Sequence, residues 1–293
     1  MKITVWGGAG FLGSHVADVL TKQGHKVTVA DKNMSSWLLD KQKMFKGDVL
    51  NKNAVAKSVA DADVVFNFSG IADIYEADLD PFKSAEVNIL GNLNLLNACI
   101  KHSVKRYIFA SSLYVYSTSG GFYRCSKQAC ENYIDEFHRQ QGLNFTILRF
   151  GSLYGPRSDG KNAIYRFIES AIRENKINYW GKPTSLRDYV HVHDAAQVCA
   201  ELLDDKFNNE NIIISGMQSF KVVDVMEMIV EMLDDNIILS YDEKADSGHY
   251  GKTPYSFTPK MAKKYVPSTQ IDFGQGLLNM VEEIHKELNI KET

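Results

Sequence analysis

Short apolar runs alternate with longer amphipathic stretches through the first half of the chain. The runs are rich in β-branched residues and have few polar positions, which is typical of strands buried on both faces of a parallel sheet. They cover residues 2–7, 26–31, 63–69, 106–112 and 145–151. The amphipathic stretches predict helices, and they cover residues 11–23, 87–102 and 123–141. The alternation predicts an α/β fold built from βαβ units, with a doubly wound parallel sheet.

The pattern changes beyond Gly155-Pro156. Two further helical patterns and one strand-like run follow, at residues 163–175, 192–203 and 211–216. From Phe220 onward the pattern is mostly helical, interrupted by a looped stretch at 242–259. We therefore expect the sheet domain to span residues 1–155, with a segment near 188–216 returning to it. Residues 156–293 are expected to form mainly a second, smaller domain.

Composition excludes several kinds of partner. The 293 residues carry a net charge of -3, which provides no general attraction to nucleic acid or to an anionic membrane. No apolar run reaches the roughly twenty residues that a spanning helix needs. The four cysteines have no disulfide-framework spacing and are expected to be reduced, at positions 99, 125, 130 and 199. These features predict a cytoplasmic protein without nucleic-acid or membrane partners.

A glycine-rich turn joins the first strand to the first helix. Gly7, Gly10 and Gly13 lie in this turn, and Phe11 and Leu12 open the helix. Glycines there let backbone N–H groups approach a pyrophosphate, and the helix N-terminus adds partial positive charge. Glycine occurs in any tight turn, so the glycines are weak evidence by themselves. Three further features make the motif specific: a strand before the turn, a helix after it, and an acid at the end of the next strand. Together they predict a dinucleotide site.

The acid at the end of the second strand is Asp31. Its carboxylate is placed to accept hydrogen bonds from an adenosine ribose and to repel a 2′-phosphate, which favours NAD over NADP. Lys32 beside it weakens that preference. Asp48, followed by Val49, is placed to contact the adenine. An equally good interpretation is that Asp48 caps the next helix.

A Ser/Tyr/Lys combination follows the strand at 106–112. Tyr123 and Lys127 are spaced i, i+4, so on a helix the ammonium lies beside the phenol. Lowering the pKa of a free Tyr by about three units, as general-base work near neutrality requires, needs roughly 4 kcal/mol, which Lys127 and a nicotinamide ring can supply. Ser112 is our first choice for the hydroxyl that binds the same substrate oxygen, and Ser111 is the second. A Tyr-x-x-x-Lys pair also arises by chance. The catalytic interpretation therefore depends on the position of the pair directly after this strand.

With these motifs in order, the chain resembles the extended short-chain dehydrogenase/reductases. Within them it resembles the nucleotide-sugar epimerase/dehydratase group, and in particular UDP-glucose 4-epimerase-like proteins. The matching segments are GGAGFLG, Asp31, SSLYVY, YRCSK, LRFGSLYGP (residues 148–156) and RDYVHVHDAA (residues 187–196). The resemblance covers nearly the whole chain, and it implies a Rossmann core with a mainly C-terminal substrate-binding domain.

The resemblance also implies roles for individual residues. Ser112, Tyr123 and Lys127 would be the catalytic trio, with Lys127 also bound to the nicotinamide ribose of NAD. Arg187 would bind the diphosphate of a nucleotide sugar, most readily a UDP-sugar, and Ser152 would lie at the substrate. The helices at 87–102 and 123–141 match those that pair across a family homodimer, although packing on their own sheet explains the same apolar positions.

Near Arg187 the sequence offers no metal site. His191 and His193 alternate along an extended segment without a nearby acid or cysteine cluster, so both are expected to be structural. Asp194 is expected to cap a helix that starts at Ala195 rather than to contact substrate.

Departures from the family pattern bear on the reaction. Leu113 and Tyr114 stand where family dehydratases carry an Asp-Glu pair, and family decarboxylases often have Glu at the second position. The connection from 116 to 123 is shorter than in common epimerases, Ser152 replaces an Asn, and an Arg-x-Gly-Asp element is missing near 242–251. Another residue would then have to supply the positive charge that binds phosphate. His249, Lys252 and Arg157 are three equal candidates.

Three functions are compatible with the sequence. The leading hypothesis is an NAD-dependent nucleotide-sugar epimerase that oxidises C4 transiently, with Tyr123 as general base. The second is an NAD(P)H-dependent 4-ketosugar-nucleotide reductase, which uses the same trio in one direction. The third is a non-catalytic, regulatory dinucleotide-binding protein, which the presence of both Tyr123 and Lys127 disfavours.

Overall fold

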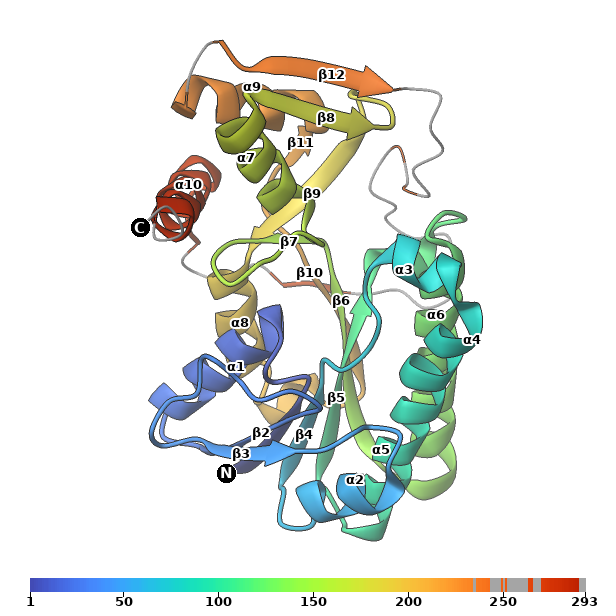
Figure 1. Cartoon of the computed structure of the whole chain (residues 1–293). Coiled ribbons are helices and arrows are strands. Elements are labelled where there is room, and N and C mark those ends of the chain that lie inside the picture. The colour runs from blue at the N-terminus through green and yellow to red at the C-terminus, as the bar shows by residue number, and fades with distance from the viewer. Residues whose placement is uncertain (234–235, 243–248, 250, 252–262, 266–269, 290–293) are drawn as a thin grey trace.

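The structure is a computed structural model that describes residues 1–233, 236–242, 249, 251, 263–265 and 270–289. A large sheet forms the lower lobe in Figure 1, and smaller sheets with three helices form the upper lobe. No helix in these ranges is long and apolar enough to cross a membrane.

The large sheet has the strand order β13-β10-β6-β5-β4-β1-β2-β3, and every neighbouring pair is parallel. Chain order reverses between β1 and β4, so the carboxyl ends of these two strands mark the switch point where such sheets bind ligands. The strands are β1 (Lys2–Trp6), β2 (Lys26–Asp31), β3 (Lys43–Lys46), β4 (Val64–Asn67), β5 (Arg106–Ser112), β6 (Asn144–Phe150), β10 (Glu210–Ile214) and β13 (Lys263–Lys264). The predicted doubly wound α/β fold is confirmed.

Helices cover both faces of this sheet (Figure 1). One face carries α1 (Phe11–Lys22) and α8 (Val192–Glu201), which pack against each other. The other carries α2 (Lys52–Val59), α5 (Gly91–Lys101) and α6 (Gly121–Gln141). Because successive strand side chains point to opposite faces, each fully buried strand contributes to two separate cores.

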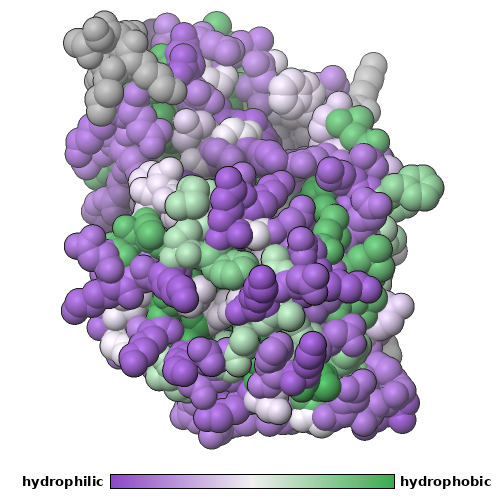
Figure 2. Space-filling model, turned by 60° about the horizontal axis from the view of Figure 1, so that its bottom comes forward, coloured by the Kyte–Doolittle hydropathy of each residue, from purple (hydrophilic) through white to green (hydrophobic). Residues whose placement is uncertain are grey.

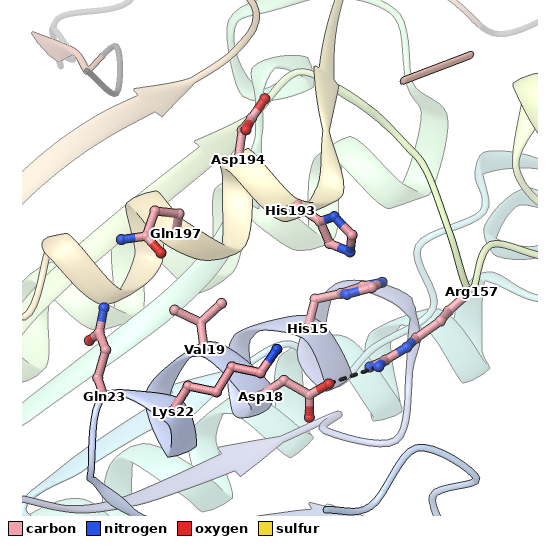
Figure 3. Close-up of a pocket in the computed structure, with 9 residues that line it drawn as sticks. All are labelled: His15, Asp18, Val19, Lys22, Gln23, Arg157, His193, Asp194 and Gln197. Carbon is pink, nitrogen blue, oxygen red and sulfur yellow. Dashed lines mark hydrogen bonds and ion pairs between the residues drawn. The ribbon is translucent and has the colours of Figure 1, made fainter. Parts of the chain in front are cut away.

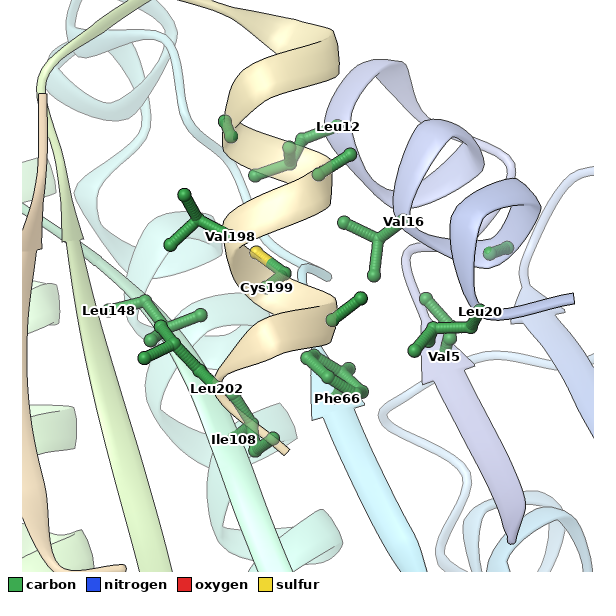
Figure 4. Close-up of a cluster of buried hydrophobic side chains, with 14 of the residues drawn as sticks. Val5, Leu12, Val16, Leu20, Phe66, Ile108, Leu148, Val198, Cys199 and Leu202 are labelled. Atoms are coloured by element: carbon green, nitrogen blue, oxygen red, sulfur yellow. The ribbon is translucent and has the colours of Figure 1, made fainter. Parts of the chain in front are cut away.

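The core beneath α1 and α8 shows this alternation (Figure 4). Val5 belongs to this core while Trp6 packs on the opposite face, and the same division separates Ile108 from Phe109. Figure 4 shows strand residues meeting helix residues here, among them Phe66, Leu148, Leu12, Val16, Leu20, Val198, Cys199 and Leu202. The near-continuous apolar runs in the sequence follow directly from burial on two sides.

The predicted helix at 87–102 differs from the structure at its start. A π-helical turn, η1 (Ala85–Leu90), precedes α5, and two short helices, α3 (Ile74–Leu79) and α4 (Pro81–Ser84), precede η1. The sequence pattern also missed β3, whose four residues are only partly buried or exposed and therefore show no apolar run. A one-sided edge strand of this length has little periodic signal.

The upper lobe has its own core. It is built on α7 (Ala163–Glu174), α9 (Val222–Leu233) and α10 (Phe273–Asn289), whose buried side chains form one cluster. Two small sheets accompany these helices: β7 (Ser152–Tyr154) and β11 (Ser219–Lys221) flank β9 (Leu186–His191), and β8 (Lys176–Trp180) pairs with β12 (Ile238–Asp242). A short turn, η3 (Asp205–Phe207), follows α8. The domain boundary at residue 155 stays a prediction, and most of the looped stretch predicted at 242–259 lies outside the described residues.

The underside of the lower lobe is mainly polar. Figure 2 turns this side forward and shows hydrophilic side chains separated by small apolar groups.

Several large apolar side chains are exposed on α3, α4, η1 and α6, namely Tyr75, Leu79, Phe82, Leu90, Phe122 and Tyr133.

A buried ion pair fastens α6 to the sheet. Glu131 of α6 accepts from Arg149 of β6 at 3.0 and 2.6 Å, and also from the Ser111 hydroxyl of β5 at 2.5 Å. Both charged side chains are almost fully buried, Arg149 at 2% and Glu131 at 6% exposure. Tyr116, in the 3-10 turn η2 (Leu113–Tyr116), contacts Arg149 through its hydroxyl and its ring face. The pair therefore sets the position of α6 along β5 and β6.

Replacing Glu131 by Gln is expected to lower the free energy of unfolding by about 3–5 kcal/mol, because it leaves the Arg149 charge buried without a counter-charge. Urea denaturation measures this change. Glu136→Gln is the matched control, since Glu136 pairs with Arg139 on the exposed side of the same helix. That control is expected to leave the free energy of unfolding nearly unchanged, because solvent screens an exposed pair, and equal losses in the two variants would contradict the assignment.

Candidate functional site

The turn between β1 and α1 is shaped by glycine. Gly7 has φ +74°, and a Cβ on it would lie 2.5 Å from the Phe68 backbone at the end of β4. A Cβ on Gly13 would lie 2.2 Å from the Gly7 carbonyl oxygen, so α1 lies directly against the turn. Gly10 is the N-cap of α1 and provides no side-chain cap, so the N–H groups of the helix start, at Phe11 and Leu12, face the turn without a capping side chain. This cradle fits the pyrophosphate of a dinucleotide.

Asp31 lies at the carboxyl end of β2, beside the same turn. Its carboxylate accepts from the Ala9 N–H at 3.2 Å and from the Asn33 N–H at 3.0 Å. These bonds hold the carboxylate at the rim of the cradle, where it is half-buried. A ribose hydroxyl placed there would donate to its remaining lone pairs. The structure thus brings the predicted phosphate-binding and ribose-binding groups together.

Asp48 and Val49 follow β3 at the same edge of the sheet. Asp48 accepts from the Leu50 N–H at 2.8 Å, whereas the cap of α2 is Asn51, whose side chain accepts from two N–H groups of the first turn. The interpretation that Asp48 caps this helix is therefore wrong: the chain makes one more turn before α2 begins. Val49 is buried against Gly91, where an added Cβ would lie 2.8 Å from it.

A single stripe of α6 faces β5. It carries Tyr123, Lys127 and, one turn further, Glu131. The Lys127 ammonium donates to the Ala110 carbonyl at 2.8 Å and lies 4.7 Å from the centre of the Phe109 ring and 5.8 Å from that of Tyr123. Burial lowers the pKa of Lys127 from its usual value. The predicted phenol and ammonium are thus neighbours at the carboxyl end of β5.

The structure distinguishes between the two serines at the end of β5. The Ser111 hydroxyl donates to Glu131 and so belongs to the buried network under α6. Ser112 is the next residue, and its side chain accepts only a long bond, at 3.3 Å, from the Tyr114 N–H in the part of the chain that the structure describes. Because neighbouring strand residues face opposite ways, Ser112 is the serine left to contact a ligand.

Asn88 is a site residue that the sequence did not indicate. Within η1, its amide bonds both backbone groups of Ile71, at 2.7 and 3.0 Å, and donates to the Ser126 hydroxyl at 2.9 Å. It thereby fixes the chain after β4, where a Cβ on Gly70 would lie 4.0 Å from the Lys127 ammonium. A π-turn inside a helix often marks a functional site, but hydrophobic periodicity carries no signal for it.

The predicted substrate residues lie on the upper lobe. Arg187 of β9 is buried at 6% exposure, and Ser152 of β7 is half-buried beside the same strand. Partial desolvation, together with the guanidinium groups of Arg187 and Arg166, lowers the pKa of His249 to about 4. His249 therefore lies near Arg187, whereas Lys252 lies outside the described residues.

Tyr114 joins the two lobes. Its hydroxyl is hydrogen-bonded to Nδ1 of His249, and its ring meets the Tyr123 ring edge-on, with centroids 6.2 Å apart. Leu113, by contrast, is fully buried. Of the two residues that replace the acids of family dehydratases, only Tyr114 therefore borders the space next to Tyr123.

Arg157 is placed elsewhere. Its guanidinium donates to Asp18 of α1 at 2.7 Å and lies over the Trp37 ring, 5.0 Å from its centre. Both residues of the ion pair line a cavity of about 490 Å³ between α1 and α8 (Figure 3). None of the predicted catalytic residues lines this cavity, so we do not assign the reaction to it.

Histidines form a row beside that cavity. His193 stacks edge-on against His15, with ring centres 4.7 Å apart, and against His191 at 5.0 Å. His191 is the N-cap of α8, accepting from the His193 N–H, whereas Asp194 accepts from the Ile271 N–H. The prediction that Asp194 caps a helix starting at Ala195 is wrong, because α8 begins three residues earlier and places Asp194 inside its first turn.

The pH dependence of stability follows from these side chains. Burial lowers the pKa of His15 to about 4, so this imidazole is neutral in the fold while the unfolded chain binds a proton below about pH 6.5. Stability is therefore lost as pH falls from 6.5 toward 4. Asp194, whose pKa burial raises to about 6, opposes this loss.

The free energy of unfolding should fall between pH 7.5 and pH 5.0, and in the His15→Gln variant this fall is expected to be smaller by about 2 kcal/mol. Urea denaturation at the two pH values measures the difference. His285→Gln, at an exposed position of α10, is the control and should leave the loss unchanged. An equal pH dependence in both variants would show that His15 does not titrate in this way.

Comparison with known proteins identifies the family. Residues 3–215 match the model of a protein family described as the NAD dependent epimerase/dehydratase family. This match confirms the resemblance and the prediction of NAD as cofactor.

Individual relatives have differing activities. A UDP-N-acetyl-alpha-D-glucosaminuronate decarboxylase of Bacillus cytotoxicus is 30% identical over 79% of this chain and 80% of its own length. A putative UDP-glucose 4-epimerase of Methanocaldococcus jannaschii is 27% identical over 78% of this chain and 81% of its own. Among solved structures, UDP-glucose 4-epimerase from Thermotoga maritima with UDP-glucose has a TM-score of 0.86 at 26% identity, covering 98% of this chain and all of that one.

Proposed function

Since the chain belongs to the NAD-dependent epimerase/dehydratase family, we propose that it is a nucleotide-sugar epimerase. It would invert C4 of the sugar by transient oxidation, with Tyr123 as general base. The observation that carries the proposal is the neighbouring Tyr123 and Lys127 at the carboxyl end of β5, joined with the absence of a carboxylate at positions 113 and 114 of the sequence.

The residues divide the work by their chemistry. Tyr123 takes the proton from the sugar hydroxyl, and the nearby Lys127 ammonium favours the phenolate form. Ser112 hydrogen-bonds the same oxygen and holds it toward Tyr123. NAD, which the β1–α1 turn and Asp31 would hold, would supply a reversible acceptor for the hydride of the sugar carbon. Inversion then requires the keto sugar to turn over beside Tyr123 before the hydride returns to its carbon and Tyr123 gives the proton back.

Arg187 and Ser152 would bind the substrate. The diphosphate of a UDP-sugar suits the guanidinium of Arg187, since charge-assisted bonds to phosphate are strong. The charges of Arg187 and of Arg166 of α7 both lower the pKa of His249, which would place three basic side chains around the same site. The relative from Thermotoga maritima is described with UDP-glucose, which makes UDP-sugars the first candidates to test.

Decarboxylation is the activity of the 30% identical relative, so it is the first competing function. Leu113 is fully buried and Tyr114 is a phenol, and neither provides the carboxylate that family decarboxylases often carry at the second of these positions. A 4-ketosugar reductase and a non-catalytic dinucleotide-binding protein also compete with the epimerase. Cofactor content and turnover distinguish these functions from one another.

Tyr123→Phe is expected to lower C4 epimerisation of a UDP-sugar by roughly 10²–10⁴-fold without changing NAD content, because it removes only the proton-accepting hydroxyl. Product formation is followed by chromatography. Tyr241→Phe, on β12 of the upper lobe, is the control and should retain full activity.

Cofactor content and product identity decide between the four functions. The nucleotide released on denaturing the purified protein should be NAD. An empty protein that binds NADPH preferentially and reduces 4-ketosugar nucleotides would replace the epimerase with a reductase. Carbon dioxide release from a UDP-uronic acid would establish a decarboxylase, and bound NAD without any turnover would leave a regulatory role.

We also propose a homodimer formed through α5 and α6. Leu90, at the end of η1, is 50% exposed, and Tyr133 of α6 is 44% exposed. These helices pack side by side on one face of the lower lobe (Figure 1) and are the pair that the sequence resemblance connects with dimer formation.

The expected cytoplasmic location stays a prediction.

The double variant Leu90→Arg, Tyr133→Arg is expected to sediment as a monomer, because it places charges in an interface core that disfavours them. Met217→Arg, at an exposed apolar position between β10 and β11, is the control and should sediment as the unaltered protein does. A dimer that survives the double variant would move the interface to another surface.

A further inference from the structure

Only six residues separate Tyr116 from Tyr123, so under the proposed function a side chain from another position would form the wall beside the sugar. Residue 114 takes this place in the structure. Tyr114 lies in η2, the turn that starts directly after Ser112, and its ring contacts the ring of Tyr123. A sugar whose reacting hydroxyl reaches Tyr123 must therefore pass close to the Tyr114 ring.

The Tyr114 ring is fixed on three sides. Gly120, at φ +99°, lies against the ring so closely that an added Cβ would be 2.6 Å from its Cδ1 atom. The Tyr123 ring meets it edge-on at 78°. His249, which follows β12 in the chain, is hydrogen-bonded to its hydroxyl. A ring that lies against Gly120, meets the Tyr123 ring and bonds His249 through its hydroxyl does not swing aside without breaking these contacts.

The segment of His249 is itself bonded to the strand that carries Arg187. The Gly251 carbonyl, two residues further on, accepts from the Leu186 N–H at 2.9 Å, directly before Arg187. Tyr114 therefore spans from the end of β5 to the strand that carries the predicted diphosphate-binding arginine. The sugar, which lies between its diphosphate and the reacting hydroxyl, is confined to this span.

We propose that Tyr114, held by His249, determines substrate size by closing the space beside the reacting carbon. The inference rests on the proposed epimerase function. A nucleotide sugar without an exocyclic carbon beside C4, a UDP-pentose, is the substrate class that this wall admits best. UDP-hexoses and UDP-hexuronates place a hydroxymethyl or carboxylate group there. A neutral phenol bonded to imidazole provides no counter-charge for the carboxylate.

The test compares kcat/KM for UDP-xylose and UDP-glucose in the NAD-loaded full-length protein. The unaltered enzyme is expected to prefer UDP-xylose by about tenfold or more, the range that one buried carbon group controls. Tyr114→Ala should lower this ratio about tenfold. Tyr114→Phe and His249→Ala each keep the ring but remove the bond between residues 114 and 249, so both should reduce the preference, and both by less than Tyr114→Ala does. Tyr241→Ala is the control for loss of a tyrosine in the upper lobe.

The outcomes separate this inference from the proposed function. Turnover of both sugars with a ratio that Tyr114→Ala leaves unchanged would overturn the inference and retain the epimerase. Absence of turnover would overturn the epimerase, and equilibrium binding of the two UDP-sugars then provides the same ratio. If that binding ratio does not shift toward UDP-glucose in a Tyr114→Ala protein with unaltered thermal stability, the wall does not limit the sugar. Should Tyr114→Ala fail to fold, Tyr114→Leu is measured in its place.

Discussion

The ammonium group of Lys127 is buried at the carboxyl end of β5, where it donates to the Ala110 carbonyl and faces the Phe109 ring. A buried cation is tolerated only if its hydrogen bonds and charge are well compensated. One carbonyl does not provide this, and the environment lowers the pKa of Lys127 accordingly. The negative charge of Glu131, one turn further along α6, acts in the opposite direction and favours the ammonium form. The same stripe of α6 reaches Glu131, whose pair with Arg149 fixes the helix on the sheet. The helix that positions Lys127 is therefore the same helix that the buried Glu131–Arg149 pair fixes on the sheet.

Much of the lower lobe could be predicted because burial on two faces leaves a strong pattern. β2 and β5 begin and end at the predicted residues, and β1, β4 and β6 differ by one or two. The glycine turn, Asp31 and the Tyr123–Lys127 pair could be found because each depends on local spacing along one strand or helix. β3, β11 and β12 were missed because they are short and partly exposed, so their sequences lack an apolar run.

Contacts between distant segments could not be predicted from such patterns. The Tyr114–His249 bond joins residues 135 positions apart, and Asn88 acts on Ile71 from within a π-turn. Arg157 was a candidate for phosphate binding, yet Asp18 on α1 takes its guanidinium. Nothing in the local sequence distinguishes an arginine paired within the fold from one held ready for a ligand. Under the proposals above, the Tyr114–His249 contact limits the sugar, which is why the sequence predicts the type of chemistry better than the sugar.

The two lobes are complementary in chemistry under the proposed function. The lower lobe supplies the cofactor cradle, the base and its cation, while the upper lobe supplies Arg187 and the histidine that fixes Tyr114. Internal oxidation and reduction by one bound cofactor is the central claim. Its most direct test uses a UDP-sugar that carries deuterium at C4. The epimerised product is expected to keep the deuterium at C4 with inverted configuration. Loss of the deuterium to water would contradict the claim, because the carbon would then exchange a proton with solvent instead of recovering its own hydrogen.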